Sequence, residues 1–295
     1  MERSGRIDGE SSAPSPKQSG KDMKDDPQYQ YVEGQARPGF PALLADYAAR
    51  SRAAAAAGDC AFDLPYGAHA RQRFDFFPAR GRPFGALAYF HAGYWQSRDK
   101  SDFRFIAPAY AQAGIHVALV NYPLCPEVSV AALVEAAKAC VPAIRVQAGP
   151  EGALVLAGHS AGAHLAVELA LAQQDDAPAI AGVAALSGIY DLAPLLATTL
   201  NDKLQLDPES ARACSPLHRV HAGAAPALVA VGAAETPAFV RQSRDFHDAW
   251  IAAGNRSTLH VEPGADHFSL LQSFASAERP LFGQVLAMFG TSERP

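Results

Sequence analysis

Short hydrophobic runs alternate with longer segments of helical character along most of the chain. The runs are short and apolar, as buried strands are, and we expect strands at residues 86–90, 116–122, 153–157, 180–186, 227–231 and 257–261. The intervening segments carry the helical period, and we expect helices near residues 105–113, 130–146, 161–173, 239–253 and 280–289. Strands that alternate with helices form a mostly parallel sheet with helices on both faces, so the pattern predicts an α/β fold.

The segments outside this alternation have different characters. Residues 1–25 are polar, with little apolar surface to offset the entropy cost of ordering, and we expect a flexible leader there. Residues 41–57 show a helical pattern, and residues 73–77 alternate like a half-buried strand. We therefore expect one domain over residues 26–295, in which the irregular residues 191–225 are a candidate small cap over a site.

Composition narrows the classes of protein. Of the 295 residues, 49% are hydrophobic and 19% are charged, which suits a soluble protein with a sizeable core. The net charge of −5 is spread along the chain, so we expect no nucleic-acid partner. We see neither a run of roughly 18 apolar residues nor a secretion signal, and we expect a cytoplasmic protein without membrane contact. The four cysteines lack the paired spacing of metal or redox sites, so we expect reduced thiols and no metal.

The stretch LAGHSAGAHLA, residues 156–166, places a serine where a predicted strand meets a predicted helix. Ser160 has Gly158 two residues before it and Gly162 two residues after it. Glycines at these positions let strand and helix approach closely around a strained serine, as in the nucleophile elbow of acyl-transfer enzymes. Ser160 is therefore the candidate nucleophile; the alternative is a glycine-rich turn with a helix-capping serine.

A serine nucleophile needs a base, and in this type of fold an acid and then a histidine follow it along the chain. His267 lies in a loop after the predicted strand at residues 257–261 and is the expected base. His159 is fixed by the elbow and is expected to point away from the serine hydroxyl. His164 is expected to be a packing residue on the helix, and His260 lies within a strand.

Two carboxylates compete for the role of the acid. Glu235 lies just past the predicted strand at residues 227–231, where such a carboxylate is expected. Asp191 follows the preceding strand and stays as the rival, because strand ends inferred from sequence shift by a few residues. We expect Glu235 to be the acid and Asp191 to cap a loop or shape the pocket.

The negative charge that develops on an attacked carbonyl needs preorganised N–H donors. The loop HAGYWQ, residues 91–96, follows a predicted strand, and the expected donors are the backbone N–H groups of Gly93, Tyr94 and Ala161. His91 is expected to brace this loop. The candidate lining of the substrate pocket consists of Trp95, Tyr122, Asp191 and His159, and Tyr94 is a further candidate wall. For Tyr94 and Trp95, packing under the loop is the alternative to contact with substrate.

These motifs together resemble the α/β-hydrolase superfamily, and within it the kynurenine formamidase (arylformamidase) group, related to the hormone-sensitive-lipase-like esterases. The resemblance covers nearly the whole chain beyond the leader. Its pieces are HAGYWQSRDKSDF, NYPLCPEVSV, GHSAGAHLA, SGIYDLAPL, GAAETPAFVRQS and GADHFSLL, at residues 91–103, 121–130, 158–166, 187–195, 232–243 and 264–271. One position departs from the group's pattern, because the first glycine of its oxyanion loop is Ala92 here.

The resemblance implies an α/β-hydrolase fold with a small cap. It also implies hydrolysis of formyl amides of aromatic amines such as N-formylkynurenine, through a triad of Ser160, His267 and Glu235 and without metal or organic cofactor. A carboxylesterase acting on short acyl esters is the alternative within the same machinery. A noncatalytic ligand-binding protein is the alternative from another class. The expected partner is a small-molecule substrate, and a homodimer is left open.

Overall fold

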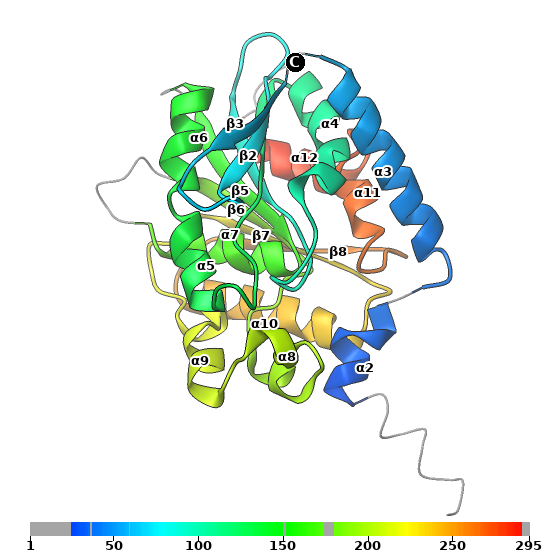
Figure 1. The fold of residues 1–295 in the computed structure, drawn as a ribbon, viewed down its shortest axis with the longest axis vertical. Helices are drawn as coiled ribbons and strands as arrows, with labels where there is room; N and C mark the ends of the chain where they lie inside the picture. Colours follow the sequence, from blue (N-terminus) through cyan, green and yellow to red (C-terminus); the bar gives the residue numbers. More distant parts are fainter. Residues whose placement is uncertain (1–24, 36, 59, 150–151, 174–179, 291–295) are drawn as a thin grey trace, which may run out of the picture.

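An eight-stranded sheet forms the centre of the molecule (Figure 1). The computed structural model describes residues 25–35, 37–58, 60–149, 152–173 and 180–290. The expected leader therefore lies outside the described residues, except for Asp25. The strands are β1 Ala61–Pro65, β2 Arg73–Phe77, β3 Gly85–Phe90, β4 Ile115–Val120, β5 Ala153–His159, β6 Ile180–Leu186, β7 Ala227–Gly232 and β8 Ser257–Glu262.

The order of the strands places a crevice at the centre of the sheet. The order is β1-β2-β4-β3-β5-β6-β7-β8, with β2 antiparallel to both β1 and β4 and all other neighbours parallel. From β3 the chain continues to β4 on one side, and β5 then pairs with β3 on the other side. In open α/β sheets, ligands bind beyond the carboxyl ends of the strands at such a reversal. Here these ends are Phe90 and His159.

Helices cover both faces of the sheet (Figure 1). One face packs against α5 Val130–Ala137, α6 Cys140–Ala148, α7 Ala161–Leu171 and α10 Pro237–Ala252. The other face packs against α3 Phe40–Ala56, α4 Ala107–Gln112, α11 Leu270–Phe274 and α12 Pro280–Ala287. The short elements are α2 Pro27–Tyr31, η1 Glu33–Gln35, η2 Lys100–Ile106, η3 Ala193–Ala197, α8 Asn201–Leu204, α9 Pro208–Ala213 and η4 Pro216–His218.

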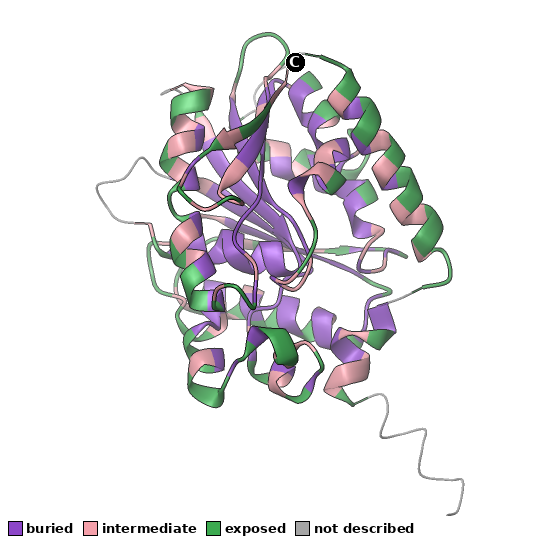
Figure 2. Cartoon of the chain, in the orientation of Figure 1, coloured by how far each residue is buried: buried purple, intermediate pink, exposed green. Residues whose placement is uncertain are grey.

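The core consists of two apolar layers separated by the sheet. Along β3, Ala88 and Phe90 contribute to one layer and Leu87 and Tyr89 to the other, as the two-residue period of a strand requires. Every residue of β3 and β7 is buried. Figure 2 shows the same burial across the central strands and along the inner faces of the helices. The mostly parallel sheet with helices on both faces, predicted from the sequence, is therefore confirmed.

The main differences from the predicted elements have local causes. The helix expected at residues 130–146 is divided into α5 and α6. Pro142 has no N–H to donate to the carbonyl of Lys138, and its ring would crowd that carbonyl, so a new helix starts at Cys140 with Pro142 in its first turn. The unpredicted strand β1 is a short, mostly exposed edge strand. The unpredicted helix α2 starts after Asp26, whose carboxylate accepts a hydrogen bond from the backbone N–H of Gln28.

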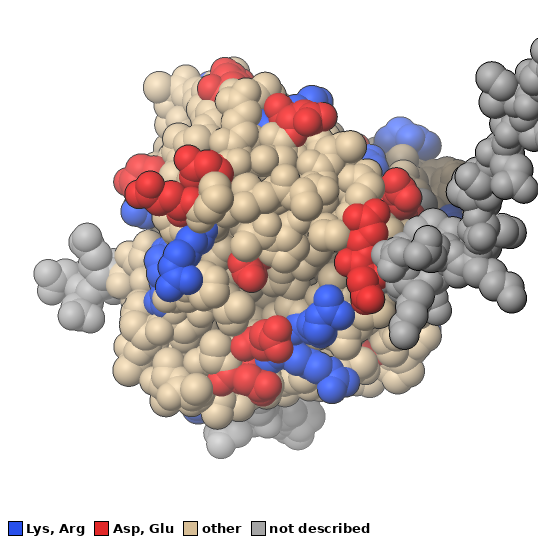
Figure 3. Space-filling view, turned by 90° about the horizontal axis from the view of Figure 1, so that it is seen from below, with Lys and Arg blue, Asp and Glu red and all other residues tan. Residues whose placement is uncertain are grey.

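The charged side chains visible in Figure 3 form small groups of both signs, separated by uncharged surface. The face in that view therefore carries no broad area of a single charge. The expectation that nucleic acid is not a partner stays a prediction. Among the described residues, no helix combines the length and the apolar character needed to cross a membrane.

Candidate active site

Ser160 occupies a strained turn between β5 and α7. Its backbone angles are φ 57° and ψ −120°, a conformation that non-glycine residues rarely adopt. A Cβ atom on Gly162 would lie 2.0 Å from the carbonyl oxygen of Phe90, and one on Gly158 would lie 2.1 Å from the carbonyl oxygen of Gly162. Both distances are far below van der Waals contact, so only glycine fits at either position. The strand–turn–helix context predicted for Ser160 is therefore present.

His267 and Glu235 meet beside this turn. His267 follows β8, and its Nδ1 lies 2.8 Å from Oε2 of Glu235, which follows β7. Both side chains are buried. Because a carboxylate only accepts hydrogen bonds, the imidazole donates through Nδ1, and Nε2 is left as the nitrogen that can accept a proton. This is the pairing of acid and base expected from the sequence.

Two further donors fix the carboxylate of Glu235. Its Oε1 accepts from the hydroxyl of Ser187 at 2.5 Å and from the backbone N–H of Gly232 at 2.8 Å. Ser187 follows β6, is fully buried and has a φ of 47°, so its backbone is held in the left-handed region. These contacts leave Oε2 directed at His267. No local pattern singles out Ser187, because its contact with Glu235 joins residues 48 positions apart.

Asp191, the rival acid, lies elsewhere. Its Oδ1 accepts from the backbone N–H of Ala193 at 3.0 Å and lies 3.8 Å from Nε2 of His218. The carboxylate thus closes a local turn that leads into η3, which fits the loop-capping role, one of the two considered for it. No contact joins it to His267 in the described part of the chain. Of the two candidate acids, the structure brings only Glu235 to His267.

A cavity of about 500 Å³ lies over the elbow. Ser160, His159 and His267 line it, together with Gly93 and Tyr94 from the loop after β3. Among the described residues, no hydrogen bond joins the hydroxyl of Ser160 to His267. Such catalytic hydrogen bonds are often long before substrate binds and shorten in the complex. The elbow and the candidate base therefore face the same space.

The loop after β3 presents free backbone donors at this cavity. Gly93, Tyr94 and Trp95 all have positive φ, at 128°, 51° and 59°. A Cβ atom on Gly93 would lie 2.2 Å from the carbonyl oxygen of Ser97, so the loop is too tight for another residue there. Within the described chain, the N–H groups of Gly93, Tyr94 and Ala161 donate to no other residue. Free N–H groups beside a serine are what an oxyanion site requires.

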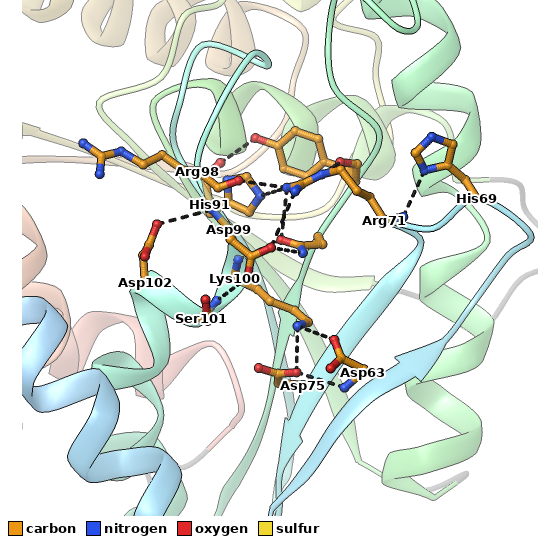
Figure 4. Close-up of polar contacts among 12 residues, drawn as sticks. Asp63, His69, Arg71, Asp75, His91, Arg98, Asp99, Lys100, Ser101 and Asp102 are labelled. Atoms are coloured by element: carbon orange, nitrogen blue, oxygen red, sulfur yellow. Dashed lines mark hydrogen bonds and ion pairs between the residues drawn. The ribbon is translucent and has the colours of Figure 1, made fainter.

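A polar network holds the same loop from behind (Figure 4). Arg71 donates to the carbonyl oxygens of Tyr122 and Arg98, both at 2.9 Å. His91 is buried, with Nδ1 lying 2.7 Å from the carbonyl oxygen of Ala92 and Nε2 lying 3.3 Å from Arg71. These contacts fix the backbone on both sides of Gly93. The described geometry thus agrees with the bracing role expected for His91.

The structure places most of the candidate pocket residues away from the cavity. Trp95 is fully buried and packs edge-on against His164, and Tyr122 is fully buried and donates to the carbonyl oxygen of His91 at 2.7 Å. Neither of these residues lines the cavity, nor does Asp191. His159 does line it, and its Nε2–H donates to the carbonyl oxygen of His267 at 2.7 Å. Trp95 and Tyr122 therefore pack in the core and do not form the pocket wall, whereas Tyr94 of the same loop lines the cavity.

The N-terminal part of the domain forms one wall of the cavity, which the sequence did not indicate. Its lining residues are Val32, Gln35, Phe40, Leu44, Ala45, Tyr47 and Ala48. Tyr47 donates to the carbonyl oxygen of Phe268 at 2.9 Å, and Gln35 donates to the hydroxyl of Thr236 at 2.8 Å. This wall is thus tied to the loops that carry His267 and Glu235. None of residues 191–225, all of them described, lines the cavity.

Removing the hydroxyl of Ser187 should loosen the orientation of the Glu235 carboxylate, although Ser187 does not line the cavity. We expect Ser187→Ala to lower kcat about tenfold and the free energy of unfolding by about 1–2 kcal/mol, because a buried carboxylate oxygen loses a donor. The matched control is Ser243→Ala, because the hydroxyl of Ser243 is buried without a partner among the described residues. Urea unfolding and steady-state kinetics of both variants measure these effects, and equal losses would contradict a positioning role for Ser187.

His91 should make the folded protein sensitive to acid. Burial lowers the pKa of His91 from 6.5 to about 4. Between these values the unfolded chain binds a proton that the folded chain excludes, so the free energy of unfolding falls as the pH falls. At 1.4 kcal/mol per pKa unit, His91 alone should remove about 2 kcal/mol between about pH 8 and pH 5. Urea unfolding at both pH values should show a smaller loss for His91→Gln, and an equal loss would refute this assignment.

Comparison with known proteins finds a matching family model and several similar proteins. A family model described as alpha/beta hydrolase fold matches residues 87–271, a range that includes Ser160, Glu235 and His267. A kynurenine formamidase of Danio rerio is 32% identical over 240 residues, which cover 78% of this chain and 82% of that protein. A kynurenine formamidase of Salmo salar is 30% identical over 241 residues, with the same coverage.

Solved structures show the same architecture. The crystal structure of a putative thioesterase from Silicibacter sp. TM1040 has a TM-score of 0.77 and 31% sequence identity, and covers 86% of this chain and 96% of that one. An esterase of the bacterial hormone-sensitive lipase family has a TM-score of 0.64 at 21% identity, covering 84% of this chain and 96% of that one. At that identity the second similarity concerns the fold alone.

Proposed function

Because the chain belongs to the α/β-hydrolase family and is a hydrolase, we propose that it cleaves formyl amides of arylamines by a triad of Ser160, His267 and Glu235. The observation that carries this proposal is the 2.8 Å contact between Nδ1 of His267 and Glu235 at the cavity that Ser160 lines. The relatives named kynurenine formamidase support the choice of an aryl formamide.

The proposed reaction has two half-reactions. The hydroxyl oxygen of Ser160 attacks the formyl carbon while Nε2 of His267 accepts its proton, and Glu235 stabilises the resulting imidazolium. The N–H groups of Gly93, Tyr94 and Ala161 donate to the oxyanion. The imidazolium then protonates the amine nitrogen as the C–N bond breaks. In the second half-reaction, His267 takes a proton from the water that attacks the formyl ester. It then gives this proton to the oxygen of Ser160 as the ester C–O bond breaks, and formic acid leaves and ionises to formate.

The walls of the cavity support an aromatic substrate with a small acyl group. The aromatic residues in the lining are Phe40, Tyr47, Tyr94, Phe103 and Phe268. Such walls hold a planar ring through apolar contact. The methyl group of Ala92, which stands where the related group has glycine, also borders the cavity beside Gly93. It narrows the space next to the expected oxyanion donors, which favours a formyl group over larger acyl groups.

A substrate panel tests the proposal. We expect a higher kcat/KM on N-formyl anilides than on p-nitrophenyl acetate. The reverse order would favour a carboxylesterase for short acyl esters. A fluorophosphonate probe, followed by peptide mapping, should place the adduct on Ser160. Folded protein that forms no adduct and turns over neither substrate would indicate a noncatalytic binding protein.

A further inference from the structure

Two side chains of opposite charge line a cavity that is otherwise largely apolar. Arg98 and Asp102 both belong to the lining and are both exposed, so they lie where the cavity meets solvent. Apart from the two histidines, the remaining lining residues carry no titratable charge near neutral pH. A cavity with an aromatic interior and one cation and one anion at its edge suits a ligand with an aromatic ring and two opposite charges.

The backbone of Arg98 is held in an unfavourable conformation. Its φ is 75°, in the left-handed region that an arginine seldom adopts, and its carbonyl oxygen is fixed by the donor from Arg71 at 2.9 Å. The Cγ atom of Arg98 lies 3.0 Å from where a Cβ on Gly93 would be, so the stem of the side chain passes beside the oxyanion loop. Strained backbone conformations of this kind are concentrated at active sites and ligand-binding sites.

The guanidinium of Arg98 is available for a ligand. In Figure 4 its side chain extends away from the network around Arg71 and Asp99. Among the described residues, none forms an ion pair or hydrogen bond with this guanidinium. Because a guanidinium presents paired N–H donors that match a carboxylate, an anion of that shape is its natural partner.

Asp102 is held in place by contacts with Ser51 and Asp99. It lies on η2, and its carbonyl oxygen accepts from the hydroxyl of Ser51 on α3 at 2.9 Å. Its Oδ2 accepts only a long hydrogen bond of 3.4 Å, from the backbone N–H of Asp99. Oδ1 is therefore left to accept from an ammonium group of a ligand.

We propose that Arg98 binds the carboxylate and Asp102 the ammonium of an amino acid whose side chain carries the aryl formamide. This proposal rests on the proposed function, because it concerns the same cavity and the same scissile bond. It makes Arg98 and Asp102 residues that determine specificity, since neutral aryl formamides leave both charges without a partner.

Three aryl formamides whose ketone side chain carries no charge, a carboxylate, or a carboxylate and an ammonium provide the test. They are ortho-formamidoacetophenone, which is uncharged, ortho-formamidobenzoyl propanoate, which adds a carboxylate, and ortho-formamidobenzoyl alanine (N-formylkynurenine), which adds an ammonium. The wild-type protein should show its highest kcat/KM on the amino acid, by about tenfold or more over the uncharged ketone, mainly through a lower KM.

Variants of Arg98 and Asp102 test which charged group of the substrate each side chain binds. Arg98→Gln should lower kcat/KM on both carboxylate-bearing substrates about tenfold more than on the uncharged ketone. Asp102→Asn should lower the preference for the amino acid over the propanoate severalfold. Arg52→Gln is the matched control, because Arg52 is exposed on α3 outside the cavity lining, and it should leave all substrate ratios unchanged.

The outcomes separate this proposal from the proposed function. If the wild-type protein cleaves all three formamides equally well, or if Arg98→Gln lowers all three rates by one factor, the charge recognition is wrong and the formamidase function stands. The wild-type comparison needs no variant, so an unstable Arg98→Gln protein does not prevent the decision. If no formamide is cleaved while p-nitrophenyl acetate is, the proposed function fails and this inference fails with it.

Discussion

Replacing Glu235 by glutamine is expected to lower kcat by roughly three to four orders of magnitude, with little change in KM. An amide at this position presents an N–H₂ or an uncharged oxygen to Nδ1 of His267. It therefore favours the wrong imidazole tautomer and removes the charge that stabilises the imidazolium. The substrate need not touch this side chain, which is buried behind His267, so binding should be preserved.

Asp191→Asn is the matched control for Glu235→Gln. It makes the same change from acid to amide at the other candidate carboxylate, which closes the turn before η3 and does not contact His267. We expect its kcat to stay within about threefold of the wild type, because the contacts of this carboxylate, with Ala193, Ser215 and His218, all lie outside the cavity lining. Steady-state kinetics on one formyl anilide measure both variants. Equal losses in the two variants would remove Glu235 from the triad.

Adding one methyl group at Gly162 is expected to destabilise the fold by more than about 3 kcal/mol and to abolish activity. The new Cβ would lie 2.0 Å from the carbonyl oxygen of Phe90, so α7 must move away from β3. That movement separates Ser160 from the oxyanion loop, which starts one residue after Phe90. Urea unfolding and the yield of the fluorophosphonate adduct measure the two effects.

The same glycine-to-alanine substitution at Gly283 is expected to raise the free energy of unfolding, not to lower it. This glycine lies exposed within α12, and a Cβ there would have no atom within 4 Å. Gly283→Ala should therefore raise the free energy of unfolding by about 0.5–1 kcal/mol, since alanine loses less backbone entropy in a helix. If Gly162→Ala does not lower the free energy of unfolding, the close contact at Gly162 is not what fixes the elbow.

The elbow was predictable because its determinants are contiguous. Gly158, Ser160 and Gly162 lie within five residues, and the flanking apolar runs identify the strand and the helix. The places of Glu235 and His267 followed from a topological rule, because loops at the carboxyl ends of neighbouring parallel strands meet at one edge of a sheet. The structure brings these two side chains together as that rule predicts.

The lining of the cavity depended on tertiary packing, which the local sequence pattern does not reveal. Trp95 and Tyr122 were expected in the pocket as aromatic residues near the oxyanion loop, but an aromatic residue in a loop fills a core equally well. The helix at residues 41–57 was predicted, whereas its place beside the cavity depends on contacts such as that of Tyr47 with Phe268. Pro142 was visible in the sequence and could have indicated the division of the helix at residues 130–146.

The cavity wall formed by Val32, Gln35 and residues of α3 has a consequence for the time at which the enzyme becomes complete. The ribosome synthesises this wall well before His267 and Leu271, which line the same cavity. Contacts of such long sequence separation form late in folding, because the intervening chain must first be ordered. A nascent chain therefore carries Ser160 before it carries His267, and the proposed turnover can begin only after the loop with His267, which follows β8, has left the exit tunnel.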